Sequence, residues 1–394
     1  MSRLILAALC LGSAGAVGAQ APADPVPAAH SGAFVARLGT DTLNVERFRR
    51  SGGSYNVEQV LHVPRTSLRH THLELSPAGE IGTVIYMHHQ IGAALDAPLI
   101  SSVTLSFPGG DSASVTEKRG DSTRVRTVAA RPNMVPALPD SWLPYEIAAM
   151  RLRASRADSA EMHFLNVSGN IMRVIVRKAG ADSMTFELPF LTYRADVGPD
   201  GQIGTLYQPN GVRVERLPTI DINAVASRWD ALDRQGRAMG PLSPLDTAEA
   251  KLGGASVSVI YSRPGMRGRE IWGRLVPWNE VWRTGANAAT VLRTDRDLLI
   301  GDKAVPAGSY TLFTLPTPSG TTLIISKETM RDGQPLAGTA FDPAHELTRV
   351  ELTTTETASP VEQFTIAVEP GSGNRGTLAL SWDHRRMTVP VVVQ

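Results

Sequence analysis

The chain has 394 residues, of which 42% are hydrophobic, with 39 Lys or Arg against 38 Asp or Glu. This length predicts two globular domains of roughly 100–200 residues each. Residues 1–21 contain one basic residue, Arg3, and no acidic one, so removing them leaves 38 basic against 38 acidic side chains. A formal charge of zero provides no basic field, which excludes nucleic acid and an anionic membrane surface as expected partners.

Residues 1–21 have the pattern of a cleaved signal peptide, because Arg3 precedes an apolar run from Leu4 to Val17 and small residues follow it. The run is shorter than the roughly 20 apolar residues of a spanning helix. Residues 22–32 form a Pro/Ala-rich tether. The sequence therefore predicts a periplasmic or secreted protein without a membrane span. Cys10, the only cysteine, lies in the signal, so hydrophobic cores rather than disulfides must stabilise the mature chain.

Residues 33–235 are expected to form an antiparallel β domain. Apolar and polar residues alternate in short runs such as SLRHTHLEL (67–75), IMRVIVRK (171–178) and GVRVERL (211–217). Such alternation is typical of strands with one buried face, and stretches such as SPAGE (76–80) are typical of hairpin turns. A curved sheet like those of periplasmic lipid carriers is expected by fold-level analogy.

Two short helices are predicted in this domain. The first lies in LPDSWLPYEIAAMRLRASRAD (138–158), with Asp140 or Ser141 as its N-terminal cap. The second lies in TIDINAVASRWDALDRQGRAMG (219–240), with Asp221 or Asn223 as its cap.

Residues 236–250 mix Gly, Pro and Ser, which predicts a linker. Residues 251–394 again contain strand-like runs, among them ASVSVIYS, YTLFTLP, TRVELTT, VEQFTIAVE, GTLALSWD and RMTVPVVV. Asp383 and His384 are expected to form the turn between the last two strands. This pattern predicts a β-sandwich of about seven to nine strands. The fold class is therefore all-β: an antiparallel sheet domain with one or two short helices, followed by a β-sandwich.

Five motifs of the second domain occur in a fixed order: YSRP (261–264), RGR (267–269), LVP (275–277), WRTGAN (282–287) and PAGSY (306–310). In these motifs residues 245–394 resemble the DUF2911 family of exported bacterial proteins. Trp272 and Trp278 depart from the family's usual Phe and Tyr, but both keep an aromatic ring. The resemblance implies a sandwich-like domain in an exported protein and implies no established chemistry.

The stretch from 261 to 287, called the Arg/Trp segment below, is the first candidate contact surface for a ligand or partner. Guanidinium groups can hold a carboxylate, phosphate or sulfate, and indole faces can stack on a sugar ring or a cation. Its candidate residues are Arg263, Arg267, Arg269, Trp272, Trp278, Trp282, Arg283 and Asn287. The alternative interpretation is structural, because a long loop over a sandwich end also needs large side chains to seal the core and arginines to satisfy its carbonyls.

A second candidate is a site for Zn²⁺ or another divalent metal. His70, His72 and Glu74 alternate on one face of a strand, and His88 or His89 follows on the next strand of the same hairpin. Two imidazoles, a carboxylate and a third imidazole suit such an ion. A tight SPAGE turn places the third imidazole only diagonally from His70, and the alternative is a solvated polar face of the sheet.

These patterns predict an exported protein that binds a small molecule, a glycan or a protein through the Arg/Trp segment. The alternatives are a metal-dependent hydrolase built on the His70 strand and a structural component of the envelope. Motifs of nucleotide binding or of a nucleophile elbow do not occur in the sequence, so no catalytic residue is assigned.

Overall fold

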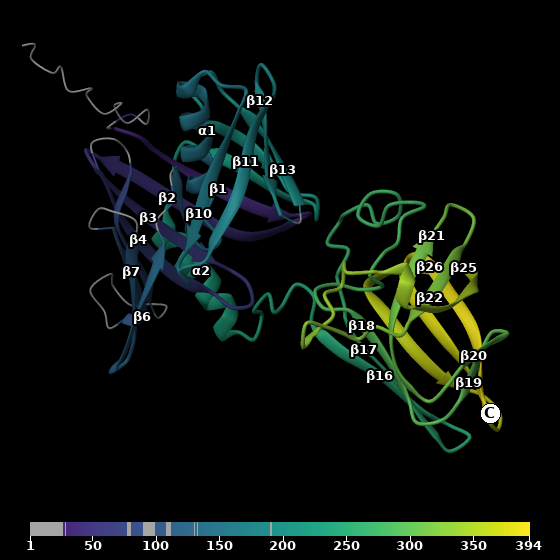
Figure 1. Ribbon diagram of the computed structural model, residues 1–394. Coiled ribbons are helices and arrows are strands. Elements are labelled where there is room, and N and C mark those ends of the chain that lie inside the picture. The colour runs from purple at the N-terminus through teal and green to yellow at the C-terminus, as the bar shows by residue number, and fades with distance from the viewer. Residues whose placement is uncertain are drawn as a thin grey trace, which may run out of the picture.

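A computed structural model describes residues 27, 29–76, 80–89, 99–107, 112–129, 131, 133–189 and 191–394. The predicted signal peptide and most of the tether lie outside these residues. Two β-rich bodies are joined by a short connection (Figure 1), and all but two of the long elements are strands. The prediction of an all-β fold is therefore confirmed. Neither of the two described helices is long and apolar enough to cross a membrane.

The first body is built on one 15-stranded sheet with the order β8-β7-β6-β5-β4-β3-β2-β1-β15-β14-β13-β12-β11-β10-β9. All neighbouring strands are antiparallel except β9 and β10. The sheet curls, because β9 at one end of this order contacts β5 near the other end. Its strands are β1 (Ser31–Leu38), β2 (Asp41–Ser51), β3 (Ser54–Leu61), β4 (Ser67–Leu75), β5 (Ile81–His89), β6 (Leu99–Ser106), β7 (Ser112–Arg119), β8 (Ser122–Ala129), β9 (Met134–Ala137), β10 (Ser159–Asn166), β11 (Ile171–Gly180), β12 (Ser183–Leu188), β13 (Leu191–Val197), β14 (Ile203–Tyr207) and β15 (Val212–Leu217).

Helix α1 (Leu143–Ser155) belongs to the interior of this curl. Most of its residues are buried, including Leu143, Ile147 and Met150, and they share one core cluster with the inner faces of the strands. A helix that is buried on nearly all sides needs little amphipathic contrast. The helix therefore occupies much of the concave side of the sheet.

Helix α2 (Ile222–Arg234) covers the opposite, convex face of the same sheet. Ile222 and Trp229 pack against Val35, Val45 and Val60 of the first three strands. The Asp221 carboxylate caps the helix by accepting a hydrogen bond from Ala224 N at 3.0 Å. This cap is one of the two predicted from the sequence, because a local Asp side chain needs no distant partner to reach the third helical N–H group.

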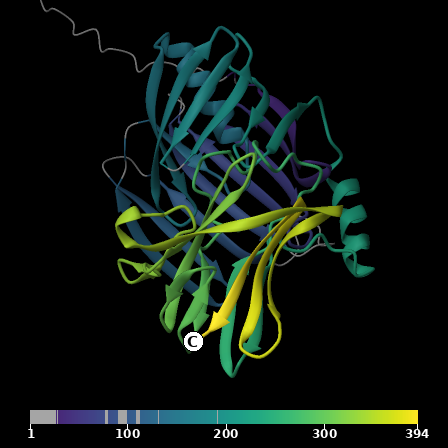
Figure 2. The same ribbon diagram turned by 90° about the vertical axis from the view of Figure 1, so that its right-hand side faces the viewer.

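The second body is a nine-stranded arrangement with the order β16-β17-β18-β21-β22-β25-β26-β19-β20. Strand β25 pairs with β22 as far as Leu352 and with β26 from Thr353 to Pro370, with register shifts on the way. It also packs across β16 and β17. Figure 2 shows the long strands β25 and β26 in yellow. Its nine strands are β16 (Leu245–Leu252), β17 (Ala255–Ser262), β18 (Thr290–Thr294), β19 (Leu298–Ile300), β20 (Lys303–Val305), β21 (Gly308–Pro316), β22 (Thr321–Ser326), β25 (Glu346–Pro370) and β26 (Arg375–Val393). The short strands β23 (Met330–Arg331) and β24 (Gln334–Pro335) form a separate two-stranded sheet.

Two local expectations differ from this structure. Residues 245–250, expected within the linker, begin strand β16, because they find a full-length antiparallel partner in β17. Asp383 and His384 do not form a turn between two strands. Asp383 has a left-handed φ of 51° inside β26, and the pairing register with β25 shifts there, so a bulge bends one continuous strand.

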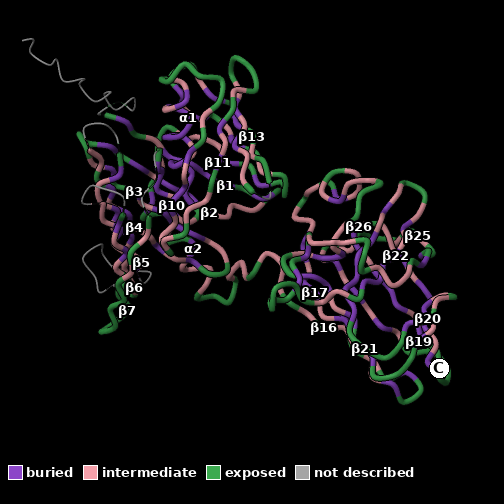
Figure 3. Tube along the Cα trace, in the orientation of Figure 1, coloured by how far each residue is buried: buried purple, intermediate pink, exposed green. Residues whose placement is uncertain are grey.

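Each body has its own buried core, as the purple segments of Figure 3 show. Residues 235–244 between α2 and β16 form no helix or strand. The two cores do not merge, so any contact between the bodies is made by turns and loops at their facing ends.

Candidate functional site

A cavity of about 460 Å³ lies in the first body between α1 and the inner face of the sheet. This volume falls in the range of roughly 300–1,000 Å³ that is typical of small-molecule sites. Residues from β2, β3, β9, β10 and β11 contribute to its wall, together with α1, the β14–β15 turn and Leu242 of the connection to the second body.

The apolar wall of this cavity is aromatic. Tyr145 of α1 lies at the centre of it, with ring centroids 5.3 Å from Phe164 and 5.5 Å from Tyr193. Burial, reinforced by the neighbouring Tyr193, raises the pKa of Tyr145 above its usual range, so the hydroxyl stays neutral. Met172 and Leu43 complete this side. The wall offers ring faces and aliphatic groups to a largely apolar molecule.

The other end of the cavity is polar. The Arg69 guanidinium donates to the Asp140 carboxylate at 2.7 Å, and the Asn44 side-chain amide donates to the Asp140 carbonyl at 2.8 Å. Trp142 Nε1 donates to Asn44 Oδ1 at 3.2 Å. These contacts fix the segment before α1 on strands β2 and β4, so a few oriented polar groups face an apolar interior.

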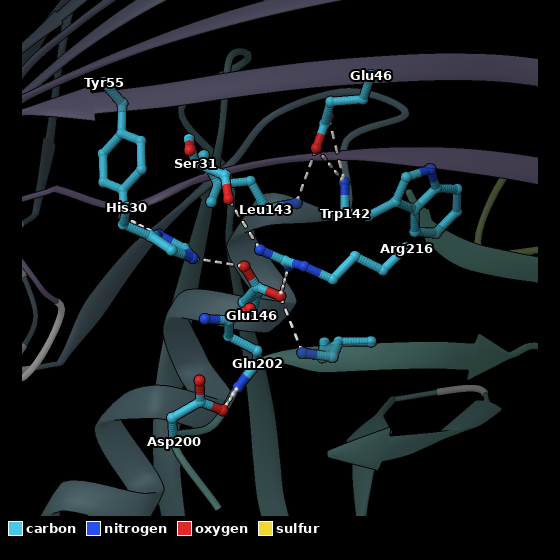
Figure 4. A network of polar contacts seen from close by, with 11 residues as sticks. His30, Ser31, Glu46, Tyr55, Trp142, Leu143, Glu146, Asp200, Gln202 and Arg216 are labelled. Carbon is cyan, nitrogen blue, oxygen red and sulfur yellow. Dashed lines mark hydrogen bonds and ion pairs between the residues drawn. The ribbon is translucent and has the colours of Figure 1, made fainter. Parts of the chain in front are cut away.

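Two buried carboxylates, Glu46 and Glu146, lie at the first turn of α1 (Figure 4). Glu46 of β2 accepts hydrogen bonds from Leu143 N at 3.0 Å and Trp142 N at 3.3 Å, and it thereby caps α1. Burial raises the pKa of Glu46 from 4.5 to about 7, although these N–H groups act in the opposite direction. The cap therefore comes from a strand that is distant in sequence, whereas Asp140 or Ser141 was expected.

Glu146 of α1 is completely buried and holds the start of β1 in place. One carboxylate oxygen lies 2.7 Å from His30 Nε2, and the other accepts from Ile203 N at 2.8 Å and pairs with Arg216. His30 Nδ1 lies 2.7 Å from the Tyr55 hydroxyl. Figure 4 shows these side chains converging on Glu146 from separate elements. This buried network of hydrogen bonds and ion pairs links helix α1 to the sheet.

The arginines of the Arg/Trp segment do not gather at one place. Arg263 bonds to Phe364 O and Thr365 Oγ1 and lies 3.2 Å from Asp246 Oδ2. Arg267 pairs with Asp41 of the first body. Arg269 donates to the carbonyls of Gly265, Met266 and Asn210.

Trp272, Trp278 and Trp282 do come together, in a cluster with Trp382. Trp272 stacks on Trp278 at 6.0 Å, and Trp282 stacks on Trp382 at 5.6 Å. The Arg385 guanidinium lies 4.6 Å from the Trp278 ring centre and bonds to the carbonyls of Thr317 and Pro318. This packing agrees with the alternative in which the segment seals the sandwich end, because the indole faces already contact other protein groups.

Arg283 and Asn287 differ from the other candidates. Burial lowers the pKa of Arg283, and no hydrogen bond or ion pair joins its guanidinium to another described residue.

Thr284 and Asn287 have left-handed φ values of 52° and 59°. A β-branched residue rarely adopts such a conformation, and the Thr284 hydroxyl lies 3.2 Å from Thr314 Oγ1 in a buried contact.

The strand register separates the predicted metal ligands. His70, His72 and Glu74 share one face of β4, and His72 Nε2 lies 3.5 Å from Glu74 Oε1. His88 pairs with Arg69 and His89 with Leu68. His88 therefore lies on the opposite face, and His89 is the residue on the His70 side. Across the described parts of the chain, no three His, Cys, Asp or Glu side chains are arranged to hold a metal ion.

His89 borders a second cavity of about 300 Å³ between the end of β5 and α2. Its side chain is buried, and burial lowers its pKa, so the ring stays neutral. Asp233 of α2 accepts a hydrogen bond from Thr66 N at 2.7 Å beside this cavity. These contacts attach α2 to the turn between β3 and β4.

Comparison with known protein families assigns only the second body to a family. Residues 243–391 match the family described as "Protein of unknown function (DUF2911)", which confirms the resemblance seen in its motifs. No curated protein matches the chain. A similar solved structure is the beta-barrel-like protein of domain of unknown function DUF1849 from Brucella abortus, with 11% sequence identity and a TM-score of 0.34. The alignment covers 48% of this chain and 96% of that one.

Sequence patterns did not indicate the cavity of the first body. Its wall residues come from many strands that alternate in the same way as the rest of the sheet, so none of them carries a motif. The one available signal was the short apolar run Ile147–Met150 of α1, which lies next to the charged residue Glu146.

Proposed function

We propose that this protein is an exported binding protein that holds a small, largely apolar ligand with one polar end in the cavity of its first body. The observation that carries this proposal is the combination of an aromatic wall around Tyr145 with the oriented Arg69–Asp140 pair at one end. Apolar pockets with a few convergent polar groups are typical of small-molecule sites. Export rests on the signal-like residues 1–21.

This proposal keeps ligand binding as the expected function and moves its main contact surface from the Arg/Trp segment to the cavity. Arg263, Arg267 and Arg269 already donate to protein acceptors. A ligand would have to displace those acceptors, which removes much of the gain from a new hydrogen bond. The aromatic and aliphatic part of the cavity wall needs no such exchange, and only the Arg69–Asp140 contact would have to rearrange for a polar group.

The test uses N-phenyl-1-naphthylamine, an uncharged apolar fluorophore, and a variant that fills the cavity. Ala137 of β9 lines the cavity, so Ala137→Trp should weaken probe binding at least roughly tenfold, equivalent to 1.4 kcal/mol. The matched control is Ala129→Trp, because Ala129 is an exposed strand residue. Melting temperatures should confirm that both variants are folded.

Two outcomes would overturn the proposal. One is wild-type protein that shows no saturable binding of the probe. The other is folded Ala137→Trp protein that binds the probe with wild-type affinity, since the probe would then occupy another place.

A further inference from the structure

The stretch Gly265–Arg269, in the first part of the Arg/Trp segment, lies against two turns of the first body. Thr40 N in the β1–β2 turn donates to Arg267 O at 3.3 Å, and the Arg267 guanidinium pairs with Asp41, the first residue of β2. Arg269 Nη1 donates to Asn210 O in the β14–β15 turn at 2.6 Å. Two arginines of one motif, Arg267 and Arg269, thus reach two separate turns.

Each of the two turns places a glycine directly against this stretch of the second body. A Cβ atom on Gly39 would lie 1.5 Å from Arg267 O, and one on Gly211 would lie 2.8 Å from Arg269 Cδ. Both glycines have left-handed φ values, of 57° and 89°. No other residue type fits at Gly39 while the Arg267 carbonyl stays in place. The two surfaces are therefore complementary at the level of backbone atoms.

The β14–β15 turn is also a wall of the ligand cavity. Gln208, Asn210 and Val212 of this turn border the cavity, as does Leu242 of the connection to the second body. Arg269 bonds to the backbone of Asn210, and its own guanidinium is fixed by the carbonyls of Met266 and Gly265. A movement of the second body would therefore move this part of the cavity wall.

We infer that Gly265–Arg269 is an intramolecular docking surface for the β1–β2 and β14–β15 turns, and that Arg269 is a positioning residue for the cavity wall. This inference rests on the proposed function, because it gives the second body a role at the site of the first. Arg269 touches the wall and not the ligand. Its contribution is to hold the β14–β15 turn in the conformation that encloses a bound molecule, which sets how fast the molecule leaves.

Two glycine variants separate docking from simple backbone strain. Gly39→Ala places a methyl group onto Arg267 O, whereas Gly52→Ala in the β2–β3 turn meets nothing within 4 Å. Gly52 has a φ of 59°, close to the 57° of Gly39, so both substitutions strain the backbone to the same degree. We expect Gly39→Ala to increase the radius of gyration in small-angle X-ray scattering and to speed proteolysis within residues 235–244. Gly52→Ala should match the wild type in both measurements.

A second pair of variants tests the cavity wall. Arg269→Gln removes the charged donor to Asn210 O, and Arg274→Gln changes an arginine of the same segment whose side chain is 76% exposed and pairs with Glu270. We expect Arg269→Gln to raise the dissociation rate of N-phenyl-1-naphthylamine by roughly threefold to tenfold, which is less than the full effect of losing a hydrogen bond from a charged group, because Arg269 contacts the wall and not the ligand. Arg274→Gln should leave the rate unchanged.

The outcomes distinguish this inference from the proposed function. If Gly39→Ala and Gly52→Ala have the same scattering and proteolysis as the wild type, the docking surface is wrong. If Arg269→Gln leaves the dissociation rate at the wild-type value, the positioning role is wrong while the cavity remains a binding site. If the wild type does not bind the probe, the proposed function fails together with the positioning role, and the scattering result still decides the docking surface.

Discussion

The Glu46 carboxylate accepts a hydrogen bond from Leu143 N at 3.0 Å, so a buried strand side chain caps the helix that forms one wall of the cavity. Burial raises the pKa of this carboxyl to about 7. The helix cap therefore changes its protonation near neutral pH, although it is completely enclosed by protein.

The raised pKa of Glu46 predicts how stability depends on pH. Between pH 4.5 and about 7 the folded protein keeps the Glu46 proton that the unfolded chain loses. The free energy of unfolding should therefore fall as pH rises through this window, by about 3 kcal/mol from this group. Urea denaturation at pH 5 and pH 8 measures the difference, which Glu46→Gln should reduce. An unchanged difference in Glu46→Gln would contradict the assignment, and Glu215→Gln, at a partly exposed site, serves as the control.

The buried Glu146–Arg216 pair between α1 and β15 should contribute far more stability than an exposed pair between β1 and β15. Arg216→Ala leaves a completely buried carboxylate without its guanidinium partner, and such a loss costs about 3–5 kcal/mol. Arg37→Ala breaks a pair with Glu215 in which the arginine side chain is 44% exposed, so the expected loss is about 0–1 kcal/mol. Chemical denaturation of both variants checks the contrast, and equal losses would show that the network contributes little.

Trp282 decides between the two interpretations of the Arg/Trp segment. It packs against Phe364 at 5.1 Å and Trp382 at 5.6 Å. We expect Trp282→Ala to lower the free energy of unfolding by about 3–5 kcal/mol, as for other large core truncations. Val281→Ala, at an exposed neighbouring residue, should have little effect. Wild-type stability in Trp282→Ala, combined with lost ligand binding, would instead make the indole a ligand contact.

The metal site predicted from the histidines can be tested by its geometry. If the strand binds Zn²⁺, then His70→Ala and His72→Ala should each lower the metal content of dialysed protein, as measured by mass spectrometry. His88→Ala should not, because His88 lies on the other face of the sheet from His70. If substituting His70, His72 or Glu74 leaves the metal content unchanged, the hydrolase hypothesis is wrong.

Local patterns in the sequence were enough for much of the fold. Alternation placed β4 at Ser67–Leu75 with the predicted bounds, and a local Asp221 cap identified the start of α2. Each of these features depends on residues that are close in the chain. The same local information failed at β16, because residues 245–250 become a strand only through pairing with β17.

The candidate site could not be predicted in this way. The cap of α1 joins residues 96 or 97 positions apart, and the pair between Arg267 and Asp41 joins residues 226 positions apart. A pattern of spacing within one segment carries no information about such partners. The Arg/Trp segment was therefore recognisable as unusual, but its contacts were not.

By itself the sequence determined the all-β class, the two predicted helices and the similarity of the second body to DUF2911, because periodicity, caps and motifs are local properties of a chain. The tertiary structure decided which arginines remain available, where the cavity lies, and that the basic motif at 267–269 touches the cavity's own turn. These depend on how the sheet curls and how two bodies meet, and curling brings together side chains that no local pattern relates.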